Sequence, residues 1–332
     1  MATLSDVAKK AVVSKMTVSR VINHPEQVSD ELRKLVYNAM KELKYVPNYA
    51  ARALVQNRTQ VVKLLILEEM DTTEPYYMNL LAGIAIELDQ HHYSLQLVTR
   101  NSHTIGKCDG VIVTGMRRED FAHIIAQLDQ PVVLFGQNEQ GYDYIDVDNR
   151  KGMQMATEHV LSLGCKHILF YGIDINEPFM ASRLEGFKRS MEHVHLKPQI
   201  CLMKNSSHVA QFEAEKILRS TERRTVFVCA SDRLGIGVVR AAQCLGLNVP
   251  GDVAVTGFDG VFLDRISHPQ LTTIRQPIVE MGKALVSLLL EKINQNGKKV
   301  GHRIFEPELI VRGSTIQSVQ TLPKESKLLG MN

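Results

Sequence analysis

Short runs of β-branched and other apolar residues recur from Val61 onward, and stretches with helical periodicity separate most of them. The runs predict eight strands, at residues 61–67, 94–99, 110–114, 132–135, 145–148, 167–171, 225–230 and 253–258. Helices are expected at residues 77–91, 120–128, 152–163 and 234–244, among other places. Such alternation indicates βαβ units, with parallel sheets and helices on both faces. A break near residues 148–152 favours two doubly wound sheets in series, with a ligand site in the cleft between the two lobes.

Two parts of this region depart from a regular repeat. Only nine residues, 101–109, join two of the predicted strands. Because a crossover between parallel neighbours needs about a dozen residues or more, a loop is expected where a helix would normally cover the sheet. After the last helical stripe, at residues 279–293, come two extended runs at 303–306 and 309–312. Residues 317–332 hold few apolar positions and predict a flexible tail.

The first 45 residues predict three short helices with a tight turn between the first two. Thr3 and Asp6 form a capping-box pattern at the start of the first helix. Ser14 is placed to cap the second helix, at residues 15–23, and Ser29 to cap the third, at residues 30–43. This arrangement is typical of helix-turn-helix architecture.

The second helix has one narrow apolar stripe, and its other face carries long donors, hydroxyls and one apolar probe. That face consists of Lys15, Met16, Thr17, Ser19, Arg20 and Asn23. Residues 1–60 hold ten Lys and Arg against five Asp and Glu, although the whole chain has a formal charge of only +3. A basic head on a near-neutral body favours a nucleic-acid-binding module joined to a domain with another task. A merely solvated basic face is the alternative.

A short linker follows the head. Pro47 disfavours helix at the residue before it and so closes the head. Asn48 can cap a helix at residues 49–56, which is rich in helix formers but marginal alone at about two turns. We therefore expect this helix to order only when it docks on a partner.

Several classes of protein are disfavoured. The N-terminal residues contain no apolar core of a secretory signal, and no stretch approaches the length of a membrane span, so a cytoplasmic protein is expected. The five cysteines show no Cys-x-x-Cys pairing, which indicates reduced thiols and no metal site. No Gly-x-Gly-x-x-Gly follows a strand, and no catalytic triad or metal-ligand spacing stands out. We therefore expect no catalysis, cofactor or metal.

Several short motifs lie along nearly the whole chain. Those in the head are Asp6-Val7-Ala8, Ser14, Thr17-Val18-Ser19-Arg20-Val21, Asn23, Val28-Ser29, Tyr45 and Pro47-Asn48. Those in the body are Arg183-x-x-Gly186-Phe187, Ser231-Asp232, Val249-Pro250-x-Asp252-Val253, Gly257-Phe258-Asp259 and Pro269-x-Leu271-Thr272-Thr273-Ile274. Together these motifs resemble the LacI/GalR family of bacterial repressors. The resemblance implies a homodimeric, sequence-specific repressor on a pseudo-palindromic operator in double-stranded DNA, with a small sugar in the cleft of each body.

The resemblance also implies an order of domains, with a body like that of type I periplasmic binding proteins. The head spans residues 1–46, and the hinge helix and linker span 47–59. The first sublobe combines 60–150 with 276–298, the second combines 151–275 with 299–316, and the tail spans 317–332. A corepressor, a non-sugar effector and a partner protein stay open as alternatives. A transport-type binding protein is less favoured because it would not need the basic head.

The family places DNA contacts in the head and hinge. Lys15 and Met16 are expected to read base edges, hydroxyl and amide side chains to hold phosphates, and Leu54 to open the minor groove as an apolar wedge. The full set is Thr3, Ser14, Lys15, Met16, Thr17, Ser19, Arg20, Asn23, His24, Ser29, Asn48, Tyr49, Arg52 and Leu54. Surface packing by Met16 and a core position for Leu54 are the alternatives. Val12 stands in a turn where many relatives have a small residue, so the turn is expected to avoid positive φ.

The family places effector contacts in the body, at Tyr76, Tyr77, Arg183, Ser231, Asp232 and Asp259. A guanidinium and carboxylates can bind vicinal hydroxyls in pairs of hydrogen bonds, and a tyrosine can stack on a sugar ring. The alternative is an Arg–Asp network that only ties the lobe together. The short 101–109 connection also occurs in some galactoside-responsive relatives, which hints at a disaccharide.

Overall fold

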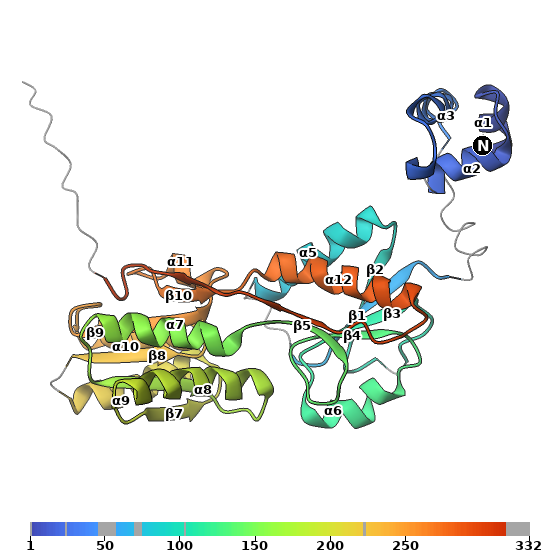
Figure 1. The fold of residues 1–332 in the computed structure, drawn as a ribbon. Coiled ribbons are helices and arrows are strands. Elements are labelled where there is room, and N and C mark those ends of the chain that lie inside the picture. The colour runs from blue at the N-terminus through green and yellow to red at the C-terminus, as the bar shows by residue number, and fades with distance from the viewer. Residues whose placement is uncertain are drawn as a thin grey trace, which may run out of the picture. The chain divides into compact units, whose positions relative to one another are not determined.

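The structure, a computed structural model, describes residues 2–23, 25–45, 58–69, 75–102, 104–221 and 224–316. The chain divides at Gln60 into two compact units, a head before it and a body after it (Figure 1). The hinge helix expected at 49–56 and the tail expected at 317–332 lie outside the described residues. None of the helices in the described ranges is long and apolar enough to cross a membrane.

Three helices form the head: α1 (Leu4–Lys10), α2 (Lys15–Asn23) and α3 (Asp30–Glu42), with a 3-10 turn, η1 (Pro25–Gln27), before the third. Their facing sides bury Val7, Val18, Val21 and Val36 completely. A capping box at Thr3 starts α1, as the sequence predicted. The three expected helices and the apolar stripe of the second are therefore confirmed.

The turn between α1 and α2 shows that the expectation for Val12 was wrong, because its φ is 55° and lies in the left-handed region. The Val13 N–H donates to Ala8 O at 3.0 Å and the Val12 N–H to Lys9 O at 3.3 Å, the two bonds of a Schellman motif. These bonds satisfy carbonyls at the end of α1. They offset a strain of about 1–2 kcal/mol, which is typical for a residue with a side chain in the left-handed region. The Val12 side chain is 89% exposed and adds no packing.

Two six-stranded sheets make up the body (Figure 1). The first is parallel throughout, in the order β11-β5-β4-β3-β1-β2. Its strands are β1 (Val61–Ile66), β2 (Ser94–Thr99), β3 (Gly110–Thr114), β4 (Val132–Phe135), β5 (Asp143–Val147) and β11 (His302–Phe305). The two sheets in series confirm the predicted fold class.

The second sheet has the order β12-β10-β9-β8-β6-β7, and β12 runs antiparallel to β10. Its strands are β6 (Ile168–Ile173), β7 (Gln199–Met203), β8 (Thr225–Cys229), β9 (Val253–Asp259), β10 (Thr272–Arg275) and β12 (Glu308–Ile310). All eight expected strands are therefore present, and the two extended runs near the end form β11 and β12. β7 and β10 were not predicted from the sequence.

Helices cover the sheets. They are α5 (Tyr76–Gln90), α6 (Arg118–His123), η2 (Ile125–Gln127), α7 (Asn149–Ser162), α8 (Pro178–His193), α9 (Ser207–Arg219), α10 (Asp232–Cys244), α11 (Leu263–Ile266) and α12 (Ile278–Asn294). α12 lies beside α5 (Figure 1), and a Cβ on Gly83 would lie 2.1 Å from Val279 O, so this approach requires glycine. The late helix α12 thus packs in the first sublobe, as the family resemblance implied.

The chain crosses between the sublobes three times. It leaves the first sheet after β5, returns from β10 to α12, and leaves again between β11 and β12. The assignment of residues 299–316 to the second sublobe was therefore wrong for residues 302–305. They pair with Tyr144–Val147 of β5, and the His302 ring stacks on Tyr144 at 4.8 Å between centroids. The last crossing lies at residues 306–307 instead.

The short connection between β2 and β3 is a loop, and none of its described residues is helical, as expected. The ammonium group of Lys63, buried on β1, donates to the carbonyl of Ile105 in this loop. Ile105 and Cys108 pack on the same cluster as Val111. A buried lysine and two apolar side chains therefore fasten the loop where a helix would otherwise lie.

Candidate functional site

The exposed face of α2 is the candidate DNA-reading surface of the head. Met16 is 73% exposed and Lys15 and Arg20 are also exposed, whereas Val18 and Val21 are fully buried on the opposite face. Thr17 and Ser19 are half-buried at the edges of this face. The helix thus presents two cations and a thioether to solvent with no acidic residue on it.

Capping residues hold the ends of the head helices. The Ser14 hydroxyl accepts from the Thr17 N–H at 3.0 Å and lies 2.8 Å from the Thr17 hydroxyl, so it caps α2 as expected. Hydrogen bonds from Thr3 hold the pKa of the Asp6 carboxyl below its usual value. Ser29 is the N-cap residue of α3, as expected, but its side chain makes no cap hydrogen bond. Its extended backbone alone starts the helix.

Several expected DNA contacts cannot be placed. His24, Asn48, Tyr49, Arg52 and Leu54 lie outside the described residues. Asn23 is the last residue of α2.

Arg183 is the centre of the candidate effector site in the body. It is 5% exposed, its Nε donates to Asn149 Oδ1 at 2.9 Å, and its Nη1 donates to Ala230 O at 2.6 Å. The guanidinium lies 3.6 Å from the centroid of the Phe258 ring, which fixes its plane. Burial lowers the pKa of Arg183, and Asp259, with Oδ1 4.0 Å from Nη2, counteracts this.

Asp259 and Asp232 have different surroundings. Asp259 ends β9 with a φ of 128°, and its Oδ1 accepts from Gln276 Nε2 at 2.8 Å. Asp232, 2% exposed at the start of α10, accepts from the Gly260 N–H at 2.8 Å and from the Thr273 hydroxyl at 2.5 Å. Burial first, and then the charge of Asp259, raise the pKa of Asp232 well above its usual value. Asp232 thus ties the start of α10 to β10 and to Gly260 after β9.

The other expected effector residues lie around this pair. Ser231 caps α10, and its hydroxyl donates to Asn205 Oδ1 at 2.7 Å. Tyr76 begins α5 in the first sublobe, and desolvation followed by the charge of Asp259 raises the pKa of its phenol. The Tyr77 hydroxyl donates to Glu68 instead, so Tyr77 is fastened within the first sublobe. Tyr76 therefore starts in the first sublobe but is close enough to Asp259 and Arg183 of the second for their charges to act on its phenol.

Two buried polar residues of this cluster, Asp146 and Asn149, were not predicted from the sequence. Asp146 on β5 is 7% exposed, and burial raises the pKa of its carboxyl. Its Oδ2 accepts from the Gln137 N–H at 2.8 Å, and its Oδ1 accepts from Asn149 Nδ2 at 3.1 Å. The run Asp146-Val147-Asp148-Asn149, which spans the end of β5 and the start of α7, was the signal that marked these positions.

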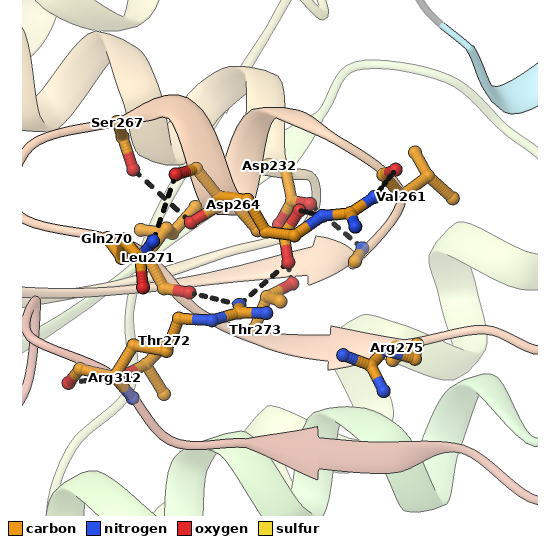
Figure 2. Close-up of polar contacts among 12 residues, drawn as sticks. Asp232, Val261, Asp264, Ser267, Gln270, Leu271, Thr272, Thr273, Arg275 and Arg312 are labelled. Atoms are coloured by element: carbon orange, nitrogen blue, oxygen red, sulfur yellow. Dashed lines mark hydrogen bonds and ion pairs between the residues drawn. The ribbon is translucent and has the colours of Figure 1, made fainter.

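A second buried ion pair lies farther along the second sheet. Asp264 on α11 is fully buried, and its Oδ2 lies 2.7 Å from Nη1 of Arg312, which also donates to Leu271 O at 2.9 Å. Figure 2 shows Arg312 reaching from the segment after β12 toward both groups. The Arg312 N–H donates to the Thr272 hydroxyl at 2.8 Å. These contacts fasten the last described segment to the second sheet.

Comparison with known proteins gives consistent matches over both units. Residues 3–48 match the family described as bacterial regulatory proteins, lacI family, and residues 157–315 match the periplasmic binding protein-like domain. The chain is 63% identical over 316 residues to the HTH-type transcriptional regulator YvdE of Bacillus subtilis (strain 168), covering 95% of this chain and 100% of that protein.

Two further matches are more distant. The chain is 29% identical over 334 residues to the ribose operon repressor of Haemophilus influenzae, covering 95% of this chain and 98% of that protein. Among solved structures it is similar to the transcriptional regulator CelR–cellobiose complex, with a TM-score of 0.71, 26% identity and coverage of 95% and 100% of the two chains. The matches therefore agree on one fold and one class of protein.

Proposed function

Since the chain belongs to the lacI family of bacterial regulatory proteins, it is a transcriptional regulator and not an enzyme, and we propose that it represses a carbohydrate-utilisation operon. A small sugar bound between the two sublobes controls its affinity for the operator. The observation that carries this proposal is the gathering of Arg183 and Asp259 from the second sublobe with Tyr76 from the first.

The charges of this cluster favour an uncharged ligand. One guanidinium, Arg183, lies among the carboxyl groups of Asp146, Asp232 and Asp259. Such a group offers no surplus positive charge to a phosphate or carboxylate ligand, whereas vicinal hydroxyls can donate to the acids and accept from the guanidinium. The names of two relatives, a ribose operon repressor and a regulator in complex with cellobiose, support a sugar as the ligand class. The loop at 101–109 favours a disaccharide. A corepressor, a non-sugar effector or a protein effector is the alternative, and a transport function is less favoured.

In the head, Lys15 and Met16 contact base edges, and the hydroxyls of Thr17 and Ser19 contact phosphates. Their exposure at the start and edge of α2 supports this division. A homodimer presents two heads to a pseudo-palindromic operator, since a two-fold protein matches a two-fold site. Hinge residues 47–59, including Leu54, transmit the state of the body to the head. Binding should weaken steeply with salt, with a log–log slope of roughly −5 if about six phosphates are neutralised.

A thermal-shift screen of the full-length protein tests the effector. Neutral mono- and disaccharides should include one that raises the Tm, while the corresponding sugar phosphates should not. Arg183→Lys keeps the charge but loses the planar fork, so it should abolish the shift. Arg189→Ala, an exposed arginine on the same helix α8, is the control and should retain it. A shift by a phosphate or a nucleobase alone would contradict the sugar.

A further inference from the structure

An unbroken chain of hydrogen bonds runs from the first sheet to Arg183. The Gln137 N–H, after β4, donates to Asp146 on β5, and Asp146 accepts from the Nδ2 of Asn149. The Oδ1 of Asn149 accepts from Arg183 Nε at 2.9 Å. Asn149 is 5% exposed and uses both ends of its amide, donating toward the first sheet and accepting from the second sublobe.

Asn149 stands where the chain first crosses between the sublobes. β5 ends at Val147, and Asn149 is the first residue of α7. α7 packs on the second sheet, because a Cβ on its Gly152 would lie 2.9 Å from Phe258 and 3.0 Å from Ile274. The Nδ2 of Asn149 also donates to Val147 O at 3.1 Å, across the crossing itself.

The same cluster reaches the second crossing through another amide. Gln276, 5% exposed, follows β10 and precedes α12 of the first sublobe. Its Nε2 donates to Asp259 Oδ1 at 2.8 Å, and its backbone N–H donates to Asp259 O at 3.1 Å. Asp259 Oδ1 is also the atom that lies 4.0 Å from Arg183. At each of two crossings, therefore, a buried amide side chain bonds to one member of the Arg183–Asp259 pair.

We propose that Asn149 and Gln276 are positioning residues that couple the Arg183–Asp259 pair to two crossings and so set the relative orientation of the sublobes. These amides and any ligand that bonds Arg183 and Asp259 then act together on the orientation of the two charged side chains. The link to regulation rests on the proposed function, since it requires the effector to bind at Arg183 and Asp259. The coupling itself is a property of the ligand-free chain.

Hydrogen exchange of the full-length, ligand-free protein tests the coupling. Asn149→Leu keeps the approximate volume and removes the amide. Exchange should become about tenfold faster on both sides of the crossing, at residues 136–148 of the first sublobe and 178–187 of α8. Asn149→Asp keeps the acceptor for Arg183 but loses the donor to Asp146, so only the first-sublobe side should change. Gln276→Leu should increase exchange at residues 259–260 and 276–281.

Ser231→Ala is the matched control, because this residue caps a helix in the same cluster while its contacts, Asn205 and Leu234, both lie in the second sublobe. It should change only the segments around residues 205 and 231–235. The proposal is overturned if Asn149→Leu affects only the first turn of α7, or if Asn149→Asp affects both sides equally. Should no sugar raise the Tm of the wild-type chain, the effector proposal fails while the exchange pattern still decides the coupling.

Discussion

The buried pair of Asp264 and Arg312 allows a sharp prediction about stability. Asp264 is fully buried and Arg312 has a side chain 12% exposed, with 2.7 Å between the charged atoms. Among the described residues, neither carboxylate oxygen of Asp264 has a hydrogen-bond partner, and its other cation, Arg265, lies 4.0 Å away with a side chain that is 60% exposed, so the ion pair with Arg312 supplies most of the compensation. Arg312→Met removes it and leaves a buried charge, which typically costs about 3–5 kcal/mol. For a body of this size, that corresponds to a fall in Tm of roughly 10 °C.

The two partners should not be equivalent. Asp264→Asn leaves an arginine that still donates to Leu271 O and has partial access to water, so it should cost only about 1–2 kcal/mol. The double variant Asp264→Leu with Arg312→Met removes both charges and should lie within about 2 kcal/mol of the wild type. Thermal and urea unfolding of the full-length chain, followed by far-ultraviolet circular dichroism, measures all three.

Arg275→Met is the control for this series. Arg275 lies on the neighbouring strand β10 (Figure 2) and pairs with Glu308 at 3.3 Å, but the two side chains are 43% and 65% exposed. Its loss should cost less than about 1 kcal/mol, as is usual for a surface pair. The reasoning is refuted if Arg312→Met costs no more than Arg275→Met, or if Asp264→Asn costs more than Arg312→Met.

Three other changes give independent tests. Val12→Gly should relieve the left-handed strain at no loss of packing, stabilising the head by about 0.5–1 kcal/mol and slowing amide exchange in α1 and α2 of the full-length chain; unchanged or faster exchange would contradict this. Because burial and Asp259 raise the pKa of Asp232, folding stability is lost as pH rises through that pKa. Asp232→Asn should therefore gain in Tm relative to the wild type as the pH rises above the ordinary carboxyl pKa of about 3.9, whereas a pH-independent difference would exclude this cause. Lys15→Ala should change base preference in operator-selection experiments while Ser19→Ala weakens all sequences alike, and identical effects would refute the division of roles.

The sequence predicted most of the strands that are buried inside a sheet, but it missed the buried β10, whose four residues, Thr272–Arg275, make too short an apolar run. β3 and β4 are buried along their whole length, so their composition alone identifies them. β7 was missed because it is an edge strand whose Ile200 and Leu202 are 40% and 47% exposed, and its pattern resembles that of a loop. β11 was assigned to the wrong sublobe because only its pairing with β5, over 150 residues earlier in the chain, decides its position.

Part of the candidate site was predicted from local sequence motifs. Arg183 and Asp259 stand in motifs that the chain carries locally, and the structure brings them within 4.0 Å of each other. The polar run at the end of β5 marked the position of Asn149, but its partner Arg183 lies 34 residues away in the chain, so the local pattern could not assign its role. Val12 was misjudged because the hydrogen bonds at the end of α1 outweigh the preference of its own side chain.

The late crossing between β11 and β12 has a consequence for synthesis on the ribosome. β5 ends at Val147, but its partner β11 starts only at His302, so the edge of the first sheet stays unpaired while the intervening chain is made. At about 5–20 residues per second this interval lasts on the order of 10–30 s. β10 likewise waits for β12, and unpaired edges are templates for pairing with other chains. Neither half of the body can finish folding before nearly all of it has been translated, whereas the head is complete in sequence from the start.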